Sequence, residues 1–226
     1  MQGDIASLYN MLQNKFGKNI ELSCALSEIT IEVKPGDIQD VCKVLKFDKE
    51  LAFDQLMDIC AVDYSQFGEG EWDTNDATAS GYSRAKSKLR TKTAKPNRFA
   101  VVYHLQSLKH NWRVRIKSFL TNDNEKISSV CSIWASANWY EREAFDLFGI
   151  FFEDHPDLRR IITDYGFVGH PFRKDFPLVG HVEMRYDAEQ GRCIYDKVEI
   201  KNRVVIPRVV RNSDHVPQDN IGGDGA

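Results

Sequence analysis

Histidines and carboxylates gather between residues 153 and 181, and both side-chain types can hold a metal ion or move protons. They are Glu153, Asp154, His155, Asp157, His170, Asp175 and His181. No pair among them has the HExxH spacing or another short ligand spacing. The sequence also contains no GxSxG, no Walker loop and no GxGxxG between a strand and a helix. We therefore predict no catalytic, cofactor-binding or metal-binding residue. The alternative is a stand-alone metal-dependent hydrolase that uses His155, His170 and nearby carboxylates.

Aromatic, arginine and carboxylate side chains are concentrated between residues 138 and 180. They assemble no recognisable catalytic or cofactor-binding set. Aromatic residues and arginine are, however, the types enriched at the centres of protein interfaces. This content predicts a stable contact with other proteins, made by a helix and by the extended segment that follows it.

The helix in this region is predicted from Asn138 to the residue before Gly149. Asn138 suits the N-cap, Glu141 stands three residues later where a capping box requires it, and Gly149 supplies the C-terminal stop. Arg142 and Asp146 are spaced to pair at i and i+4. The apolar arc is wider than one buried stripe, which leaves apolar surface for a partner.

Other elements follow from apolar periodicity. Helices are predicted at 4–16, at 37–46 with Asp37 as its cap, and at 126–134 with Ile127, Val130, Cys131 and Trp134 on one face. A strand is predicted at 28–34, and two strands within 98–120 joined by a short link at 109–111. Residues 51–64 could form a helix followed by a strand, and periodicity does not separate the two. Arg113, Arg115 and Lys117 are placed on the outward face of the second sheet strand, as a solvated row or as a site for a partner's carboxylates.

Residues 65–97 interrupt the pattern, because they are rich in Gly, Ser, Thr, Ala and Asn and contain few large apolar side chains. Such a segment buries too little surface to offset its ordering entropy, so we predict a flexible, solvated insertion. The predicted organisation is a domain at 1–150 that contains this insertion, an extended interface arm at 151–211 with a possible hairpin, and a polar tail at 212–226. The hairpin would join 182–186 to 192–200.

Composition excludes several classes of protein. The chain has 226 residues, 42% hydrophobic content and a net charge of −3, which suits a globular protein without a basic field for nucleic acid. Its five cysteines include no CxxC pair, which predicts reduced thiols in a cytosolic compartment, most of them small apolar side chains. The N-terminus does not resemble a signal peptide, and no apolar run approaches the length of a membrane span. Any membrane attachment is expected through partners.

Three motifs carry a family resemblance: Glu141-Arg-Glu-Ala-Phe-Asp-Leu-Phe-Gly149, His155-Pro-Asp-Leu-Arg-Arg160 and Gly169-His-Pro-Phe-Arg-Lys-Asp-Phe-Pro-Leu178. They resemble the 30 kDa subunit of proton-pumping NADH:quinone oxidoreductase, respiratory complex I. The resemblance covers about 50–64 and 98–206. With the predicted elements it implies an α+β fold, with N-terminal helices packed on a mixed or antiparallel sheet, followed by an extended C-terminal arm. The insertion at 65–97 departs from the family pattern.

The resemblance also implies a function. Such a chain is a core subunit of the hydrophilic arm, carries no cofactor itself, and scaffolds the quinone-reducing module of a complex that couples electron transfer from NADH to quinone with ion translocation. FMN and iron–sulfur clusters are expected on partner subunits, and the 49 kDa subunit and other hydrophilic-arm subunits are the expected partners. No nucleic acid is expected as a partner. The complex would lie at the cytoplasmic face of the bacterial inner membrane.

An equivalent subunit of a membrane-bound hydrogenase or a related quinone-linked complex is the alternative within the family. The positions implied to be interfacial are the motif charges and histidines together with the neighbouring Trp139. They are Trp139, Glu141, Arg142, Glu143, Asp146, His155, Arg159, Arg160, His170, Arg173, Lys174 and Asp175.

Overall fold

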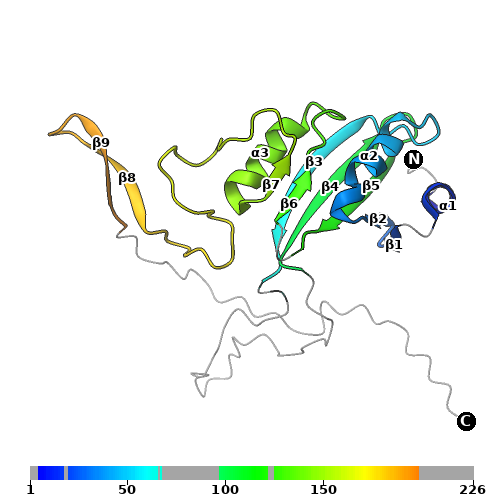
Figure 1. The fold of residues 1–226 in the computed structure, drawn as a ribbon, viewed down its shortest axis with the longest axis horizontal. Helices are drawn as coiled ribbons and strands as arrows, with labels where there is room; N and C mark the ends of the chain where they lie inside the picture. The colour runs from blue at the N-terminus through cyan, green and yellow to red at the C-terminus, as the bar shows by residue number, and fades with distance from the viewer. Residues whose placement is uncertain (1–4, 18–19, 66, 68–96, 122–124, 199–226) are drawn as a thin grey trace, which may run out of the picture. The chain divides into compact units, whose positions relative to one another are not determined.

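A computed structural model of the chain describes residues 5–17, 20–65, 67, 97–121 and 125–198 (Figure 1). Among the described residues, 5–17, 20–65, 97–121 and 125–198 belong to one compact unit. The predicted insertion and the polar tail fall almost entirely outside the described residues. No helix in the described part is both long enough and apolar enough to cross a membrane.

The N-terminal half confirms the first two predicted helices and the first predicted strand. Its elements are α1 (Ile5–Phe16), β1 (Glu21–Ala25), β2 (Glu28–Glu32), the 3₁₀ turn η2 (Pro35–Asp37), α2 (Ile38–Phe47) and β3 (Gln55–Asp63). Asp37 stands at the N-cap of α2, but its side chain makes no capping hydrogen bond. Residues 51–64 contain the strand β3 and no helix, so the helical part of the prediction for this segment is wrong.

Five strands form one mixed sheet in the order β1-β2-β5-β4-β3 (Figure 1). The predicted hairpin is β4 (Phe99–Ser107) and β5 (Trp112–Phe119), and its tight link includes Asn111 at φ 54°. Strand β2 runs parallel to β5, and the other neighbouring pairs are antiparallel. Alternate residues of β4 and β5 enter a core shared with the apolar faces of α1 and α2.

The prediction of a helix at 126–134 is wrong. Residues 126–128 form β6 (Lys126–Ser128), which pairs in parallel with β7 (Phe151–Glu153), and α3 (Ala137–Phe148) is the connection between them. Ile127, Val130 and Trp134 are buried as the periodicity suggested. An apolar run this short is compatible with a helix or a strand. Residues 126–128 form a strand because they pair with β7, 25 residues later in the sequence.

The start of α3 also differs from the prediction, whereas its end agrees. The N-cap is Ser136 without a side-chain capping bond, so Asn138 and Glu141 form no capping box. Gly149 ends the helix at φ 79°. A Cβ on Gly149 would lie 2.6 Å from both Arg173 Nη2 and His170 Nε2, so only glycine fits there.

After β7 the chain is irregular to residue 181 and then forms the predicted hairpin, β8 (Val182–Asp187) and β9 (Arg192–Lys197). The predicted part of this hairpin beyond residue 198 lies outside the described residues. All five cysteines are free, as predicted, but only Cys42 is a buried apolar side chain. Cys60 and Cys131 are half-buried and donate to the carboxylates of Asp58 and Glu141.

The two ends of the predicted insertion are held together by the sheet, since Tyr64 N donates to Arg98 O at 2.7 Å. Replacing residues 66–96 with a link of about four Gly and Ser residues should therefore preserve the fold. A shorter loop costs less closure entropy, so thermal melting should show an unchanged or raised Tm. A marked fall in Tm would show that the insertion packs on the domain.

Candidate functional site

Helix α3 carries two buried carboxylates that bind different parts of the chain. Glu141 and Asp146 both have fully buried side chains. Buried charged groups require hydrogen-bond partners. The partners of Glu141 come from the loop before α3. The partners of Asp146 come from the segment after β7, so α3 holds both segments in place.

Glu141 holds the loop that connects β6 to α3. Its Oε1 accepts from Val130 N at 2.7 Å, and its Oε2 accepts from Ser129 Oγ at 2.5 Å and Cys131 Sγ at 3.3 Å. Burial raises the pKa of the Glu141 carboxyl, and the hydrogen bonds oppose that rise only in part. The residue therefore has a structural role that the capping-box prediction did not identify.

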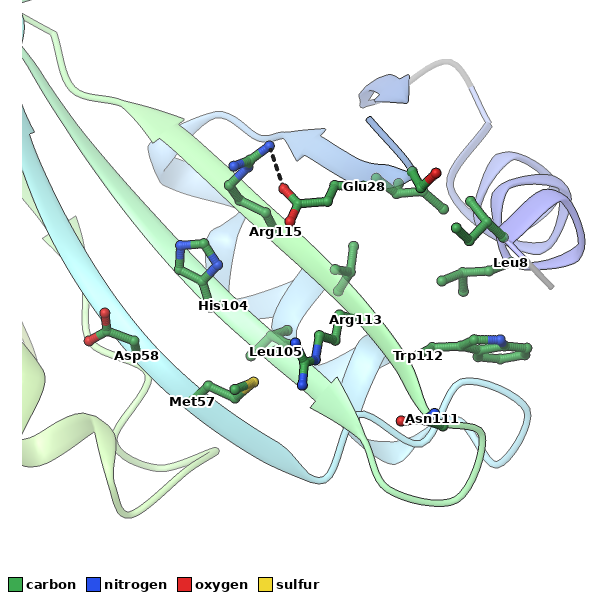
Figure 2. Close-up of a pocket in the computed structure, with 14 residues that line it drawn as sticks. Leu8, Glu28, Met57, Asp58, His104, Leu105, Asn111, Trp112, Arg113 and Arg115 are labelled. Atoms are coloured by element: carbon green, nitrogen blue, oxygen red, sulfur yellow. Dashed lines mark ion pairs between the residues drawn. The ribbon is translucent and has the colours of Figure 1, made fainter. Parts of the chain in front are cut away.

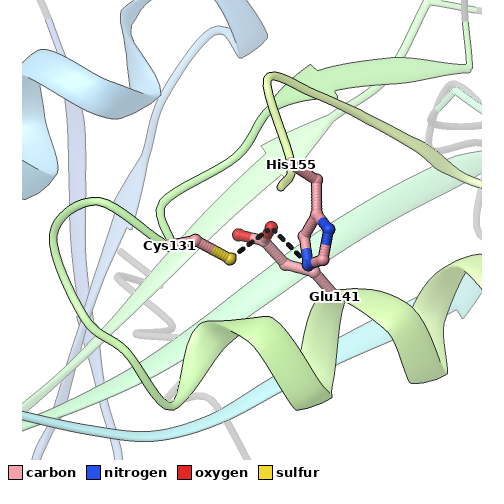
Figure 3. Close-up of side chains that lie close together, drawn as sticks. All are labelled: Cys131, Glu141 and His155. Atoms are coloured by element: carbon pink, nitrogen blue, oxygen red, sulfur yellow. Dashed lines mark hydrogen bonds and ion pairs between the residues drawn. The ribbon is translucent and has the colours of Figure 1, made fainter. Parts of the chain in front are cut away.

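Cys131, Glu141 and His155 form the one group of metal-capable side chains found among the described residues (Figure 3). Their ligand atoms lie within 4.8 Å of one another. His155 Nδ1 accepts from Asp157 N at 3.0 Å, so the proton of the neutral ring lies on Nε2, which faces Asn138 O at 3.3 Å. A metal ion at Nε2 would need that proton to move to Nδ1 and would break the bond from Asp157.

The protonation states of Cys131 and His155 also disfavour a bound metal ion. Burial raises the pKa of the Cys131 thiol to about 12, although metals bind thiolate. Burial lowers the pKa of His155, so the 3.9 Å approach of its Nε2 to Glu141 is not an ion pair. The arrangement suits hydrogen bonding within the chain, and the absence of a metal stays a prediction.

Asp146 holds the segment after β7. Its Oδ2 accepts from the backbone N–H groups of three consecutive residues, Ile161, Ile162 and Thr163, at 2.8–3.0 Å. Its Oδ1 accepts from Arg160 Nη1 at 2.8 Å and from the Thr163 hydroxyl. Burial opposes ionisation, but the hydrogen bonds from Thr163, Ile162 and Arg160 outweigh it and hold the pKa of Asp146 well below its usual range.

The same segment caps the C-terminus of α3, where the last carbonyls have no partner within the helix. Arg160 Nη1 lies 3.3 Å and His170 Nδ1 2.9 Å from Asp146 O. Phe172 N donates to Leu147 O at 3.1 Å, and Arg173 Nε donates to Phe148 O at 2.6 Å. Cationic side chains at this helix end are also favoured by the helix dipole.

A second attachment joins the arm to the sheet. The buried carboxylate of Asp63, at the end of β3, accepts from Lys174 N at 2.9 Å and from Arg98 Nη2 at 3.3 Å. Arg98 also donates to Asp175 at 2.8 Å. Arg173 Nη2 pairs with Glu125 at 2.7 Å. Residues 173–175 are thus held by groups that sequence analysis did not connect with them.

The predicted interface residues separate into two sets. Those bonded mainly within the chain are Glu141, Asp146, His155, Arg160, His170 and Arg173. Trp139, Arg159, Lys174 and Asp175 are exposed, and Glu143 is half-buried. Arg142 does not pair with Asp146 as predicted, because it lies over the Trp139 ring at 5.1 Å and its Nε lies 3.5 Å from Arg159 O. An interfacial role for these residues stays a prediction.

Sequence analysis missed the partners that complete these bonds, namely Ser129, Thr163, Asp63 and Glu125. No spacing signal links Asp63 to Lys174, 111 positions later. It also missed the exposed apolar side chains of the arm: Ile162, Tyr165, Val168, Phe172 and Leu178. Apolar residues in a segment rich in proline and charge are a signal that could have identified them.

A hollow of about 640 Å³ lies on the outward face of the sheet (Figure 2). Its charged lining consists of Glu28, Asp58, Arg113 and Arg115, and Arg115 Nη2 pairs with Glu28 at 3.4 Å. Arg113, Arg115 and Lys117 lie on the less buried side of β5, as predicted, and their role as a solvated row or as a partner site stays a prediction. Two acids against two cations favour neither an anionic nor a cationic ligand, so the hollow supports no ligand assignment.

Comparison with known proteins identifies relatives for this fold. Residues 31–182 match the family model described as respiratory-chain NADH dehydrogenase, 30 kDa subunit, so the match stops at the first residue of β8. Several curated relatives are each named as the C-subunit of NADH-quinone oxidoreductase. That of Hydrogenovibrio crunogenus is 51% identical over 219 residues, covering 94% of this chain and 97% of the relative. That of Coxiella burnetii strain RSA 493 is 49% identical over 209 residues, covering 91% and 92%.

Solved structures show the same fold. A trypsin-resistant fragment of Nqo5 superposes with a TM-score of 0.50 and 27% identity, covering 67% of this chain and 98% of the fragment. A chain of the membrane-bound sulfane sulfur reductase, an archaeal respiratory membrane complex, gives a TM-score of 0.56 at 21% identity, covering 77% and 86%. The second likeness concerns the fold alone.

Proposed function

This chain belongs to the respiratory-chain NADH dehydrogenase 30 kDa subunit family, and on that premise we propose that it is a scaffold in the peripheral arm of NADH:quinone oxidoreductase. It orders the quinone-reducing module, while the whole complex couples electron transfer from NADH to quinone with ion translocation. The chain has no turnover alone. It carries no cofactor, and FMN and iron–sulfur clusters belong to partner subunits.

One observation carries the scaffold role: the arm is bonded to the chain's own domain by its charged groups, while its apolar groups are left exposed. Asp146 binds residues 160–163, the last carbonyls of α3 bind residues 170, 172 and 173, and Asp63 binds Lys174. Tyr165, Val168 and Leu178 are 94%, 87% and 95% exposed. Apolar side chains held outward on a fixed backbone suit a stable contact between subunits, because little ordering entropy is lost on binding.

The 49 kDa subunit is the partner that the family resemblance suggests for this surface, with other hydrophilic-arm subunits beside it. In this proposal the chain lies at the cytoplasmic face of the bacterial inner membrane and is attached only through those partners. The hydrogenase alternative is not favoured, because the relatives at about half identity carry the NADH-quinone oxidoreductase name. The hydrolase alternative is not favoured either, because His155 is hydrogen-bonded within the chain.

Changing the exposed residues of the arm tests the proposal. A double variant, Tyr165→Asp with Val168→Asp, should lower NADH:quinone reductase activity of membranes about tenfold or more when it replaces the wild-type chain in cells. The reason is that two carboxylates would be buried at the contact. Activity and the amount of this chain in the purified complex are both measured.

The matched control is Leu26→Asp with Leu108→Asp, because these side chains are 97% and 65% exposed on the domain. The control should retain activity, and both isolated double variants should melt like the wild type. Equal loss in both double variants would contradict a role for the arm in particular. NADH oxidation or a stoichiometric redox centre in the purified wild-type chain would contradict the scaffold role itself.

A further inference from the structure

The imidazole ring of His155, two residues after β7, is held on both sides. Its side chain is fully buried. Nδ1 accepts from Asp157 N at 3.0 Å, and Nε2 lies 3.3 Å from Asn138 O in the first turn of α3. A ring nitrogen that accepts a hydrogen bond carries no proton, so Nε2 carries the proton of the neutral ring. The ring therefore joins the turn 155–157 to α3 in its neutral form.

Charged groups of both signs surround this ring. Glu141 Oε2 lies 3.9 Å from Nε2, and Cys131 donates to the same oxygen at 3.3 Å (Figure 3). The charge of Asp157 favours a protonated ring, and the charge of Arg142 disfavours it. Burial raises the pKa of the two remaining titratable groups that act on Glu141, so both are neutral. They are Cys42 of α2 and Tyr103 of β4.

Acid acts on this arrangement through Nδ1. The lone pair of Nδ1 can accept the Asp157 N–H or bind a proton from solvent, but it cannot do both. Protonation therefore breaks that hydrogen bond and leaves a charged ring with two N–H donors. The nearest acceptors for these donors are two carboxylates. Asp157, which pairs with Arg159 at 3.0 Å while the ring is neutral, can accept from Nδ1–H, and Glu141 attracts Nε2–H.

We propose that His155 is a pH-sensitive switch at the start of the arm, which closes the turn 155–157 onto α3 when the ring is neutral and opens it when a proton from solvent binds Nδ1. In the open form, Nδ1–H donates to the Asp157 carboxylate. The inference does not rest on the proposed function, because it concerns bonds within this chain. Asp146 binds residues 160–163 separately, so the switch leaves that attachment in place.

The direction of the pH dependence follows from the burial of the ring. Burial lowers the pKa of His155, and the bond to Asn138 O opposes this only in part. The closed turn is therefore fully favoured above the unfolded pKa of about 6.5, and this stabilisation is lost as the pH falls toward the folded pKa. Glu141 competes for the proton, because burial raises its pKa. A proton on Glu141 would leave the turn closed.

NMR of the full chain, with ¹⁵N-labelled histidine, tests the switch between pH 8 and pH 4.5. At pH 8 the His155 ring should carry its proton on Nε2 alone. On acidification Nδ1 should become protonated with a midpoint below about 6.5, and the protection factor of the Asp157 amide should fall about tenfold with the same midpoint. The control is Glu189 N, which donates to Asp187 at 2.8 Å across the same spacing and should keep its protection.

Two variants separate the switch from other effects of acid. His155→Asn places an amide oxygen near the position of Nδ1, where it accepts from Asp157 N and takes up no proton, so this amide should stay protected throughout. Asp157→Asn keeps the backbone N–H and removes the charge that favours the protonated ring, so the midpoint should move to lower pH. Loss of protection in His155→Asn at the wild-type midpoint, or a neutral His155 ring at pH 4.5 in the wild type, would overturn the switch.

Discussion

Replacing Asp146 with asparagine should release residues 160–163 of the C-terminal arm from α3. An asparagine amide places an NH₂ group where Oδ1 or Oδ2 now accepts, so either Arg160 or the three backbone N–H groups of residues 161–163 lose their acceptor. Breaking a buried, hydrogen-bonded ion pair costs about 3–5 kcal/mol. Hydrogen exchange should show lost protection at Ile161, Ile162 and Thr163. Assembly into the complex should fail with it.

Asp157→Asn is the matched control, because Asp157 forms an exposed ion pair with Arg159 only 11 positions from Asp146. Exposed pairs contribute about 0–1 kcal/mol, so the control should retain protection at 161–163. Retained protection in Asp146→Asn would contradict the anchoring role. Loss of protection in both variants would show that the arm is held too weakly for Asp146 to be its anchor.

Acid should release residues 160–163 from α3 in the wild type as well. Because the pKa of Asp146 is lowered in the folded chain, its contribution to the free energy of unfolding is complete above the unfolded pKa of about 3.9. That contribution is lost as the pH falls below this value toward the folded pKa. Protection at 161–163 should therefore decline with acidification in the wild type, and Asp146→Asn should lack this pH dependence.

Truncating Glu141 to alanine should destabilise the domain by about 3 kcal/mol or more. The change leaves Val130 N–H and the Ser129 hydroxyl without their acceptor and opens a buried cavity. Glu141→Gln is the matched variant, because its carbonyl accepts from Val130 and its NH₂ donates to Ser129 Oγ. We expect the glutamine variant to remain within about 1 kcal/mol of the wild type in urea unfolding.

The pH dependence of the free energy of unfolding distinguishes the protonated from the ionised form of the Glu141 carboxyl. Burial raises the pKa of Glu141, so its contribution favours folding most below the unfolded pKa of about 4.3 and declines as the pH rises toward the folded pKa. Glu141→Gln should remove this decline in unfolding measured between pH 4 and pH 8. A glutamine variant as unstable as the alanine one, with Zn²⁺ stabilising only the wild type, would instead indicate a metal at Cys131, Glu141 and His155.

Local pattern predicted the elements whose partners lie nearby. The first two helices and the β4–β5 hairpin were predicted because their apolar period and short link are local properties. The helix at 126–134 was wrong because Ile127 and Val130 are buried in either conformation, and the choice depended on β7. The capping box failed for a similar reason, since Glu141 found better donors in the loop 129–131.

The sequence by itself determined the family, because the three motifs are recognised from the types and order of their residues. Their contacts in the fold are not needed for this. It also determined the α+β class and the position of Gly149, where the positive φ favours glycine and a Cβ would meet Arg173 and His170. Only the tertiary structure decided that Asp146, Arg160 and Arg173 bind the chain itself while Tyr165 and Met184 face outward. The sequence does not show which group a charged side chain will bind. Its partner is set by which backbone donors the fold brings within about 3 Å, and those lie up to 111 positions away.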